Sequence, residues 1–153
     1  MLLYNIVRSN ALPVLAQDFF TLMTNATRSL GILEIDAEGA GTASAYTEMG
    51  VYRVTAVGTT GSAPITPSPV NPAQPAFGGV VDTAWATYPT VGALVHTIPV
   101  NSNGQRYFWR AMPNLSNAIW VPGGGATVAA GQISVRPITV SGNVTVRMQV
   151  GEI

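Results

Sequence analysis

Hydrophobic and polar residues alternate most clearly near the C-terminus of the chain. Over residues 143–150, valine and methionine occupy every second position, with polar residues between them. A period of two is typical of a β-strand with one buried and one solvated face. Residues 127–138 alternate in a similar way, and Pro137, Ser141 and Gly142 punctuate the join between the two segments. We therefore expect two strands that pair as a hairpin.

Two upstream segments also have strand patterns. Over residues 30–38, apolar and acidic side chains alternate, which predicts a strand with one acidic face. Over residues 45–57, both parities contain apolar residues, which indicates a strand covered on both faces. In the first segment the apolar positions are Leu33, Ile35 and Ala37, and the acidic ones are Glu34, Asp36 and Glu38. Shorter strands are expected at residues 2–7, 93–100, 107–109 and 118–121.

Residues 12–23 fit two different structures. Their apolar residues follow helical spacing, and Pro13 suits the first turn of a helix. The same stretch also reads as a strand over residues 16–22. The strand is the preferred interpretation because the neighbouring segments are strands. The residues with helical spacing are Leu12, Leu15, Ala16, Phe19, Phe20 and Met23.

Residues 59–90 are expected to form one long loop. Proline fixes φ and donates no backbone hydrogen bond, so the proline-rich part is not expected inside a sheet. Long loops are usually functional or disordered, and a free linker would rarely expose three aromatic residues. The loop either folds over its own sandwich or forms an arm that docks on a neighbouring subunit. Its prolines at the centre are Pro64, Pro67, Pro69, Pro72 and Pro75, and its aromatic residues are Phe77, Trp85 and Tyr88.

Seven to nine short strands, Gly/Pro turns and no alternation of strands with helices predict an all-β fold. We expect a single-domain β-sandwich or jelly roll over residues 1–153, with the proline-rich loop at residues 59–90 within it.

The charge content narrows the possible functions. The chain of 153 residues has seven Arg, no Lys and seven acidic residues, so only 9% of residues are charged and the net charge is zero. An average protein has about 25% charged residues. The arginines are scattered along the sequence, which argues against nucleic acid as a partner. No apolar run approaches a membrane span, no signal peptide is recognisable, and the absence of cysteine excludes disulfides and Cys-ligated zinc. A surface with so few charges favours association with other proteins.

The sequence contains few residues that could form a catalytic or metal-binding site. The one histidine, His96, is expected at the core or edge of its strand rather than in a catalytic triad. The acidic face at Glu34, Asp36 and Glu38 could hold calcium or pair with arginines of a partner, but a solvated strand face is the simpler interpretation. We therefore expect no enzyme activity, no cofactor and no metal.

Aromatic residues at 107–109 and 120 have two possible roles. They could form a platform for sugars or anchor a protein interface. Strand alternation predicts that Tyr107 and Trp109 share one face, with Phe108 on the other. The residues expected at a partner interface are Pro64, Pro67, Pro69, Phe77, Trp85, Tyr88, Phe108 and Arg110.

The order of segments resembles that of small virion proteins of tailed bacteriophages, and in particular head decoration (cement) proteins. The resemblance covers nearly the whole chain by pattern and contains no invariant motif. It is carried by residues 16–20 (AQDFF), 28–35 (RSLGILEI), 48–55 (EMGVYRVT), the proline-rich 65–72 (ITPSPVNP), the turns at 107–113 and 121–124, and Glu152.

The resemblance implies a β-sandwich or jelly-roll body, commonly trimeric, that binds outside an icosahedral shell over junctions between capsomers. The implied partners are other copies of the chain and the major capsid protein. The implied location is the capsid surface of a virion assembled in the host cytoplasm. Two other functions remain open: another virion component, such as a tail, fibre or minor capsid protein, and a carbohydrate-binding module that uses Trp109 and Trp120.

Overall fold

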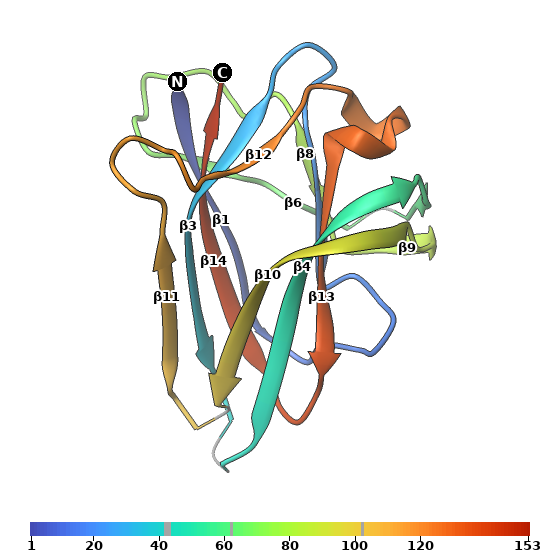
Figure 1. Ribbon diagram of the computed structural model, residues 1–153, viewed down its shortest axis with the longest axis vertical. Helices are drawn as coiled ribbons and strands as arrows, with labels where there is room; N and C mark the ends of the chain where they lie inside the picture. Colours follow the sequence, from blue (N-terminus) through green and yellow to red (C-terminus); the bar gives the residue numbers. More distant parts are fainter. Residues whose placement is uncertain (42–43, 62, 102) are drawn as a thin grey trace.

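The computed structural model describes residues 1–41, 44–61, 63–101 and 103–153. Two six-stranded sheets, in which every pair of neighbouring strands is antiparallel, face each other (Figure 1). Sheet A has the order β11 (Arg106–Arg110), β3 (Leu30–Gly39), β14 (Val144–Glu152), β1 (Leu2–Ala11) and β7 (Ser68–Pro69), and β12 (Ile119–Val121) also pairs with β3. Sheet B has the order β10 (Thr90–Asn101), β4 (Tyr46–Ala56), β13 (Gln132–Thr139), β2 (Phe20–Met23), β8 (Val80–Asp82) and β6 (Pro64–Ile65). A separate ribbon pairs β5 (Thr59–Thr60) with β9 (Trp85–Thr87).

One hydrophobic core lies between the two sheets. Every second residue of β14, from Val144 to Val150, is buried in this core, as the alternation predicts. Met49 and Val51 of β4 face them from sheet B. Burying apolar surface in this way contributes about 25 cal/mol per Å². The all-β sandwich is therefore confirmed, whereas its jelly-roll variant is not.

The predicted hairpin between the last two strands is wrong. β14 lies in sheet A and β13 in sheet B, so the turn at residues 140–143 crosses from one sheet to the other. Alternation shows which face of a strand is buried, but it does not show which sheet contains the strand. β13 also begins later than expected, because two short 3₁₀ turns, Gly125–Thr127 and Ala129–Gly131, precede it.

A β-bulge changes the expected faces of β3. Gln149 of β14 lies opposite Glu34, but its neighbour Val150 lies opposite Ile32, so Leu33 is an additional residue in β3. The shift brings Ile32 as well as Ile35 into the core. Leu33 was expected to share a face with Ile35, but it lines a groove with Gln149 instead.

The ambiguous segment contains a strand and no helix. β2 covers only Phe20–Met23, and residues 12–19 form the irregular connection that leads into it. Ala16 has a φ of 63°, which neither a helix nor a strand adopts. The strand interpretation is therefore confirmed for the end of the segment only.

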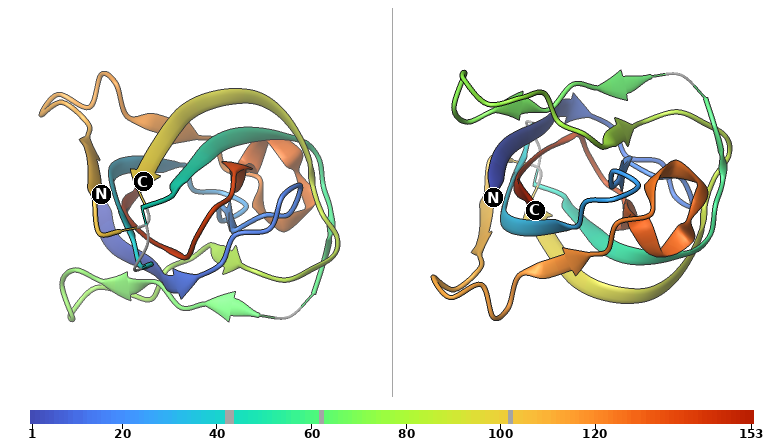
Figure 2. Two further views of the ribbon diagram at one scale, coloured as in Figure 1. Left: turned by 90° about the horizontal axis from the view of Figure 1, so that it is seen from below. Right: turned by 90° about the horizontal axis from the view of Figure 1, so that it is seen from above.

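The proline-rich segment is not the structureless loop that was expected. It contributes β6 to one edge of sheet B and β7 to one edge of sheet A, in addition to β5, β8 and β9. Pro64 opens β6 and Pro69 ends β7, and both strands lie at sheet edges, the positions in a sheet that tolerate proline. Figure 2 shows the segment passing from one sheet to the other along one side of the sandwich.

Candidate functional site

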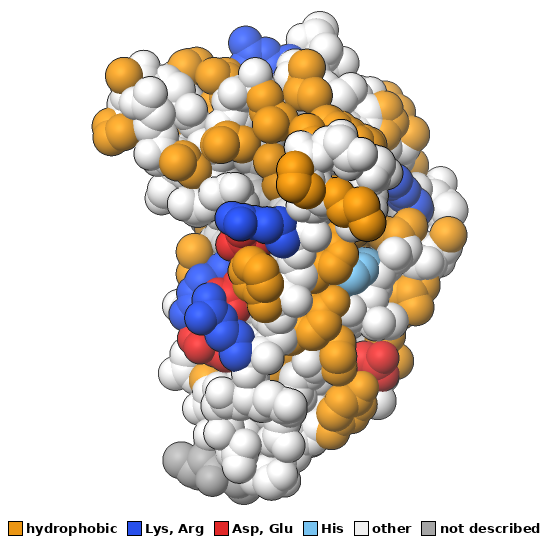
Figure 3. Space-filling model, turned by 60° about the vertical axis from the view of Figure 1, so that its left-hand side comes forward, with side chains coloured by type: hydrophobic (Ala, Val, Ile, Leu, Met, Phe, Trp, Pro, Cys, Tyr) orange, Lys and Arg blue, Asp and Glu red, His pale blue; other side chains and the backbone are white. Residues whose placement is uncertain are grey.

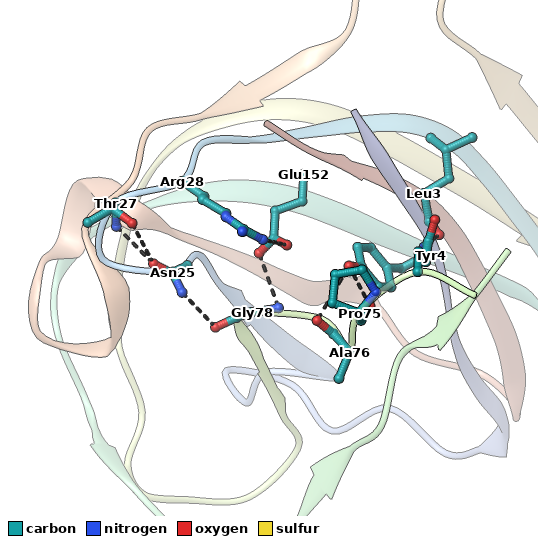
Figure 4. Close-up of polar contacts among 10 residues, drawn as sticks. Leu3, Tyr4, Asn25, Thr27, Arg28, Pro75, Ala76, Gly78 and Glu152 are labelled. Carbon is teal, nitrogen blue, oxygen red and sulfur yellow. Dashed lines mark hydrogen bonds and ion pairs between the residues drawn. The ribbon is translucent and has the colours of Figure 1, made fainter. Parts of the chain in front are cut away.

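The end of the proline-rich segment is bound to its own sandwich by hydrogen bonds (Figure 4). The Tyr4 hydroxyl donates to the carbonyl oxygen of Pro75 at 2.9 Å, and the Gln74 side chain donates to the carbonyl of Leu3. The Gly78 N–H donates to the buried carboxylate of Glu152 at 3.2 Å. These contacts favour the interpretation that the segment folds over its own sandwich.

Glu152 also accepts a hydrogen bond from Arg28 at 3.1 Å. Its side chain is 1% exposed, whereas that of Arg28 is 45% exposed. Asn25 donates to the carbonyl of Gly78 at 3.3 Å (Figure 4). The C-terminal strand therefore holds both the β2–β3 connection and the proline-rich segment.

The aromatic residues of the same segment are largely covered. Phe77 packs edge-on against Tyr4, with ring centroids 5.1 Å apart, and Trp85 is buried. Tyr88 is half-buried and donates a hydrogen bond to Gln17 at 2.9 Å. In this single chain these three predicted interface residues therefore have intramolecular contacts.

The remaining predicted interface residues separate into two places. The prolines line the β6–β7 seam, where Pro64 and Pro69 are exposed and Pro67 is half-buried. Phe108 and Arg110 lie on β11, at the opposite edge of sheet A. The structure therefore does not bring the eight residues into one surface.

The acidic face of β3 pairs with arginines of the same chain. Arg106 donates to both carboxylate oxygens of Asp36, at 2.6 and 2.8 Å. Arg147 donates to Glu38 at 2.6 Å and lies 3.4 Å from Asp36. Arg110 donates to Glu34 at 3.0 Å. The arginines come from strands β11 and β14, which flank β3.

This arginine–carboxylate cluster has three positive and three negative side chains, and so no net charge. Hydrogen bonding from Arg106 lowers the pKa of Asp36 below its usual value, which keeps the carboxylate ionised. The hypothesis that partner arginines neutralise the acidic face is therefore unnecessary. Within the described ranges, no group of three or more His, Cys, Asp or Glu side chains is arranged to hold a metal ion.

The cluster could not be recognised in the sequence, because its arginines are far apart along the chain. Arg106, Arg110 and Arg147 are scattered along the chain, but pairing of β11 and β14 with β3 brings them to the same sheet face. The alternation of the three acidic residues was the signal that could have located it.

One seam between the sheets is closed by aromatic side chains. Nε2 of His96 in β10 lies 2.7 Å from the hydroxyl oxygen of Tyr107 in β11, and the His96 ring is 5.0 Å from that of Trp109. Burial lowers the pKa of His96. Tyr107 and Trp109 pack against the core while Phe108 is exposed, as the alternation predicts. His96 is thus an edge histidine, as expected.

Exposed hydrophobic residues lie on β10 and β11 and on β4, which pairs with β10. We use the name apolar band for four residues on β4, β10 and β11 that are between 36% and 53% exposed. Figure 3 shows hydrophobic side chains gathered beside the arginine–carboxylate cluster on this side of the molecule. The residues of the apolar band are Tyr46, Leu94, Val95 and Phe108.

The indoles proposed as a sugar platform pack against the chain itself. Trp109 lies against His96, and the Trp120 ring covers Gly31, where an added Cβ would lie 2.8 Å from the ring. Each indole therefore has an intramolecular contact.

A buried ion pair on the outer side of sheet B was not predicted. The side chain of Asp18 is 0% exposed and that of Arg136 is 14% exposed. Asp18 accepts hydrogen bonds from Arg136 at 2.8 Å, from Ser134 at 2.6 Å and from Thr21. Arg136 also donates to the carbonyl of Pro89 at 3.0 Å. This network ties the β1–β2 and β9–β10 connections to sheet B.

Comparison of the chain with protein-family models, curated proteins and solved structures finds no match. In the described part of the chain, no helix has the length and apolar character needed to cross a membrane. The likeness to phage decoration proteins therefore stays a prediction.

Proposed function

We propose that this chain is a non-enzymatic structural protein of a phage virion. It binds the outer surface of an icosahedral capsid and stabilises the shell as a decoration protein, acting as a homotrimer. The observation that carries this proposal is the apolar band, which lies exposed beside a cluster whose charges are neutralised within the chain.

The chemistry of this surface suits attachment to a large protein lattice. Burial of exposed rings and aliphatic side chains drives protein association without a charged partner. Because the six charges of the cluster already pair with one another, docking beside them leaves no charge unpaired. The surface is therefore compatible with a neutral, partly apolar patch on capsid subunits.

Weak contacts of this kind are sufficient to stabilise an assembled capsid shell. A protein that binds the assembled shell, but not its free subunits, stabilises the shell by mass action. A trimer presents three copies of the band, so that its contacts reinforce one another. A rigid sandwich pays little ordering entropy when it docks.

Cryo-electron microscopy of virions that contain this chain tests the proposal. We expect density for the β-sandwich on the outer face of the capsid, with the apolar band against the shell. Absence of density on the capsid contradicts the proposal. Density confined to the tail or fibres would show that the chain is another virion component, such as a tail or fibre protein.

A binding experiment with stripped capsids tests the surface itself. The variants Leu94→Asp and Phe108→Asp each place a charge in the band, and we expect each to weaken shell binding about tenfold or more. Val128→Asp is the matched control, because Val128 is also 45% exposed and lies outside the band. Equal binding by all three variants would remove the band from the interface.

A further inference from the structure

One pair of adjacent residues is prone to a spontaneous chemical change. Asparagine is followed by glycine at Asn103 and Gly104, and at no other position of the sequence. The backbone nitrogen of the residue after an asparagine can attack the side-chain amide of that asparagine. Glycine hinders the attack least, because it has no Cβ. This pair is therefore the most susceptible in the chain to loss of the side-chain amide, which is called deamidation.

The pair lies in a connection that joins the two sheets at one end of the sandwich. β10 ends at Asn101 on the edge of sheet B, and β11 begins at Arg106 on the edge of sheet A. Asn103 and Gly104 form an exposed turn between the two strands, at the lower end of the molecule in Figure 1. Both residues lie outside the strands, so ladder hydrogen bonds do not fix the backbone here.

The backbone nitrogen of Gly104 has open space around it. The φ of this glycine is 93°, which a residue with a Cβ rarely adopts. In the described part of the chain, no atom beyond its chain neighbours lies within 4 Å of the place where a Cβ would be. Rotation of the backbone at Gly104 toward the Asn103 side chain therefore meets little steric resistance.

Most other asparagine side chains are held by hydrogen bonds. Oδ1 of Asn71 accepts a hydrogen bond from the Ala73 N–H at 3.0 Å, and Oδ1 of Asn114 accepts one from the Ser116 N–H at 3.1 Å. Among the residues that the structure describes, the side-chain amide of Asn103 has no such partner. The other asparagines with hydrogen-bonded side chains are Asn10, Asn25, Asn101, Asn117 and Asn143.

Asn5 also has no side-chain hydrogen bond to a described residue, but its strand protects it. It lies in β1 between β14 and β7, opposite Gln149 and Ser68. The next residue, Ile6, has a branched side chain buried in the core, which hinders approach to its backbone nitrogen. Of the asparagines, all of which the structure describes, Asn103 alone combines a following glycine, an exposed turn and an unheld amide.

We propose that Asn103 deamidates spontaneously in the folded protein. The backbone nitrogen of Gly104 loses its proton to hydroxide and forms a bond to Cγ of Asn103. The Cγ–Nδ2 bond breaks, and ammonia leaves with a proton taken from water, which regenerates the hydroxide. The product is a succinimide ring, which a water molecule opens at either carbonyl carbon to give aspartate or isoaspartate. The net change is uptake of water and release of ammonia, with no oxidant or cofactor.

Deamidation changes both the charge and the backbone of the connection. The new carboxylate lies near Arg106 in the chain, the arginine that donates to Asp36. It also gives a chain with zero net charge one net negative charge. Isoaspartate adds a carbon atom to the backbone between the two sheets, where the Gln105 carbonyl accepts a hydrogen bond from the Gly39 N–H at 3.4 Å. The modification depends on the chemistry of this turn and not on the proposed function.

Timed incubation followed by peptide mapping tests the proposal. The folded chain is incubated at neutral and at mildly alkaline pH and then cleaved with trypsin, which cuts after arginine. One peptide, residues 54–106, contains Asn71, Asn101 and Asn103, so the first two are internal references. We expect the mass increase of deamidation mainly at Asn103, and faster at alkaline pH because the attacking nitrogen must lose a proton. No increase at Asn103, or an equal increase at all three, overturns the proposal.

Two variants separate this site from the rest of the chain. Asn103→Gln keeps an amide but would have to close a larger ring, so isoelectric focusing should no longer show a more acidic form accumulating with time. Asn71→Gln is the matched control, because Asn71 is also exposed and precedes a proline, and it should accumulate the acidic form at the wild-type rate. Persistence of the acidic form in Asn103→Gln, or its loss in Asn71→Gln, overturns the proposal.

The rate in the unfolded chain tests whether the folded turn permits the reaction. We expect deamidation of Asn103 in the folded chain to be within about tenfold of its rate in guanidinium, so that the fold adds less than about 1.4 kcal/mol to the barrier. Any greater slowing would show that the turn keeps the Gly104 nitrogen away from the Asn103 side chain, and it would overturn the proposal.

Discussion

The imidazole of His96 and the hydroxyl of Tyr107, 2.7 Å apart, join the edge strands of the two sheets. β10 ends sheet B and β11 ends sheet A, so this hydrogen bond spans the seam beside the apolar band. Trp109 lies against the same imidazole and shields the seam. His96 and Tyr107 adjoin Val95 and Phe108 of the band in the chain, so protonation of the imidazole would change a contact beside the band.

Acidification should weaken this seam. Burial lowers the pKa of His96 below the value of about 6.5 that is usual for histidine, so the unfolded chain binds more protons than the folded chain below that pH. The contribution of His96 to stability is therefore complete above about pH 6.5 and falls as the pH drops toward the folded-state pKa. Urea unfolding at several pH values measures this slope.

His96→Gln is the control for this pH dependence, because glutamine retains a polar group but does not titrate. The slope between pH 5 and 6.5 should decrease in this variant, and an unchanged slope would assign it to other groups. Tyr107→Phe should cost about 1 kcal/mol near neutral pH, as expected for one hydrogen bond.

Loss of the buried ion pair should be the most damaging single change to the polar groups. Asp18→Ala leaves Arg136 with its charge partner removed in a buried position, and such changes cost about 3–5 kcal/mol. Glu38→Ala is the comparison, because its pair with Arg147 is about 40% exposed on both sides and should contribute about 0–1 kcal/mol. Similar losses in both variants, measured by chemical denaturation, would contradict this account.

Glu152 should control the order of the proline-rich segment. In Glu152→Ala, the Gly78 N–H and Arg28 lose their acceptor, so amide exchange at residues 74–79 should accelerate before the core opens. Stability should fall by about 1.5–3 kcal/mol, the range for a hydrogen bond to a charged group. Exchange at wild-type rates in this segment would show that the other contacts hold it alone.

Gly31 should tolerate no side chain while Trp120 covers it. An added Cβ would lie 2.8 Å from the indole, so Gly31→Ala should displace the ring at a cost of about 1–3 kcal/mol. In a Trp120→Ala background the same substitution should cost markedly less. A double-mutant cycle measures the difference, and equal costs in both backgrounds would rule out the steric cause.

The sequence predicted the faces of strands better than their partners. Alternation located the buried side of β14 and the exposed Phe108, because each depends on local periodicity. It misplaced Leu33, since one bulge residue reverses the phase of the pattern. The crossing between β13 and β14 could not be predicted, because a turn between sheets has the same composition as a hairpin turn.

The surface was harder to predict for a related reason. Asp18 and Arg136 are separated by 118 positions, and neither has a distinctive neighbour in the sequence. The proline-rich segment was assigned to a loop because proline suits turns, but proline also suits the edges of sheets. Trp85 was predicted to lie at a partner interface, but it is buried in the structure, where its strand β9 pairs with β5.

The edge strands of the two sheets affect how the chain behaves when many copies are close together. β6, β7 and β10 each contain a proline, at Pro64, Pro69 and Pro99, and β11 is bracketed by Arg106 and Arg110. Both devices hinder a foreign strand from adding to a sheet by backbone hydrogen bonds. At high concentration, copies of this chain are therefore expected to associate through side-chain contacts rather than to aggregate into fibrils by pairing of edge strands.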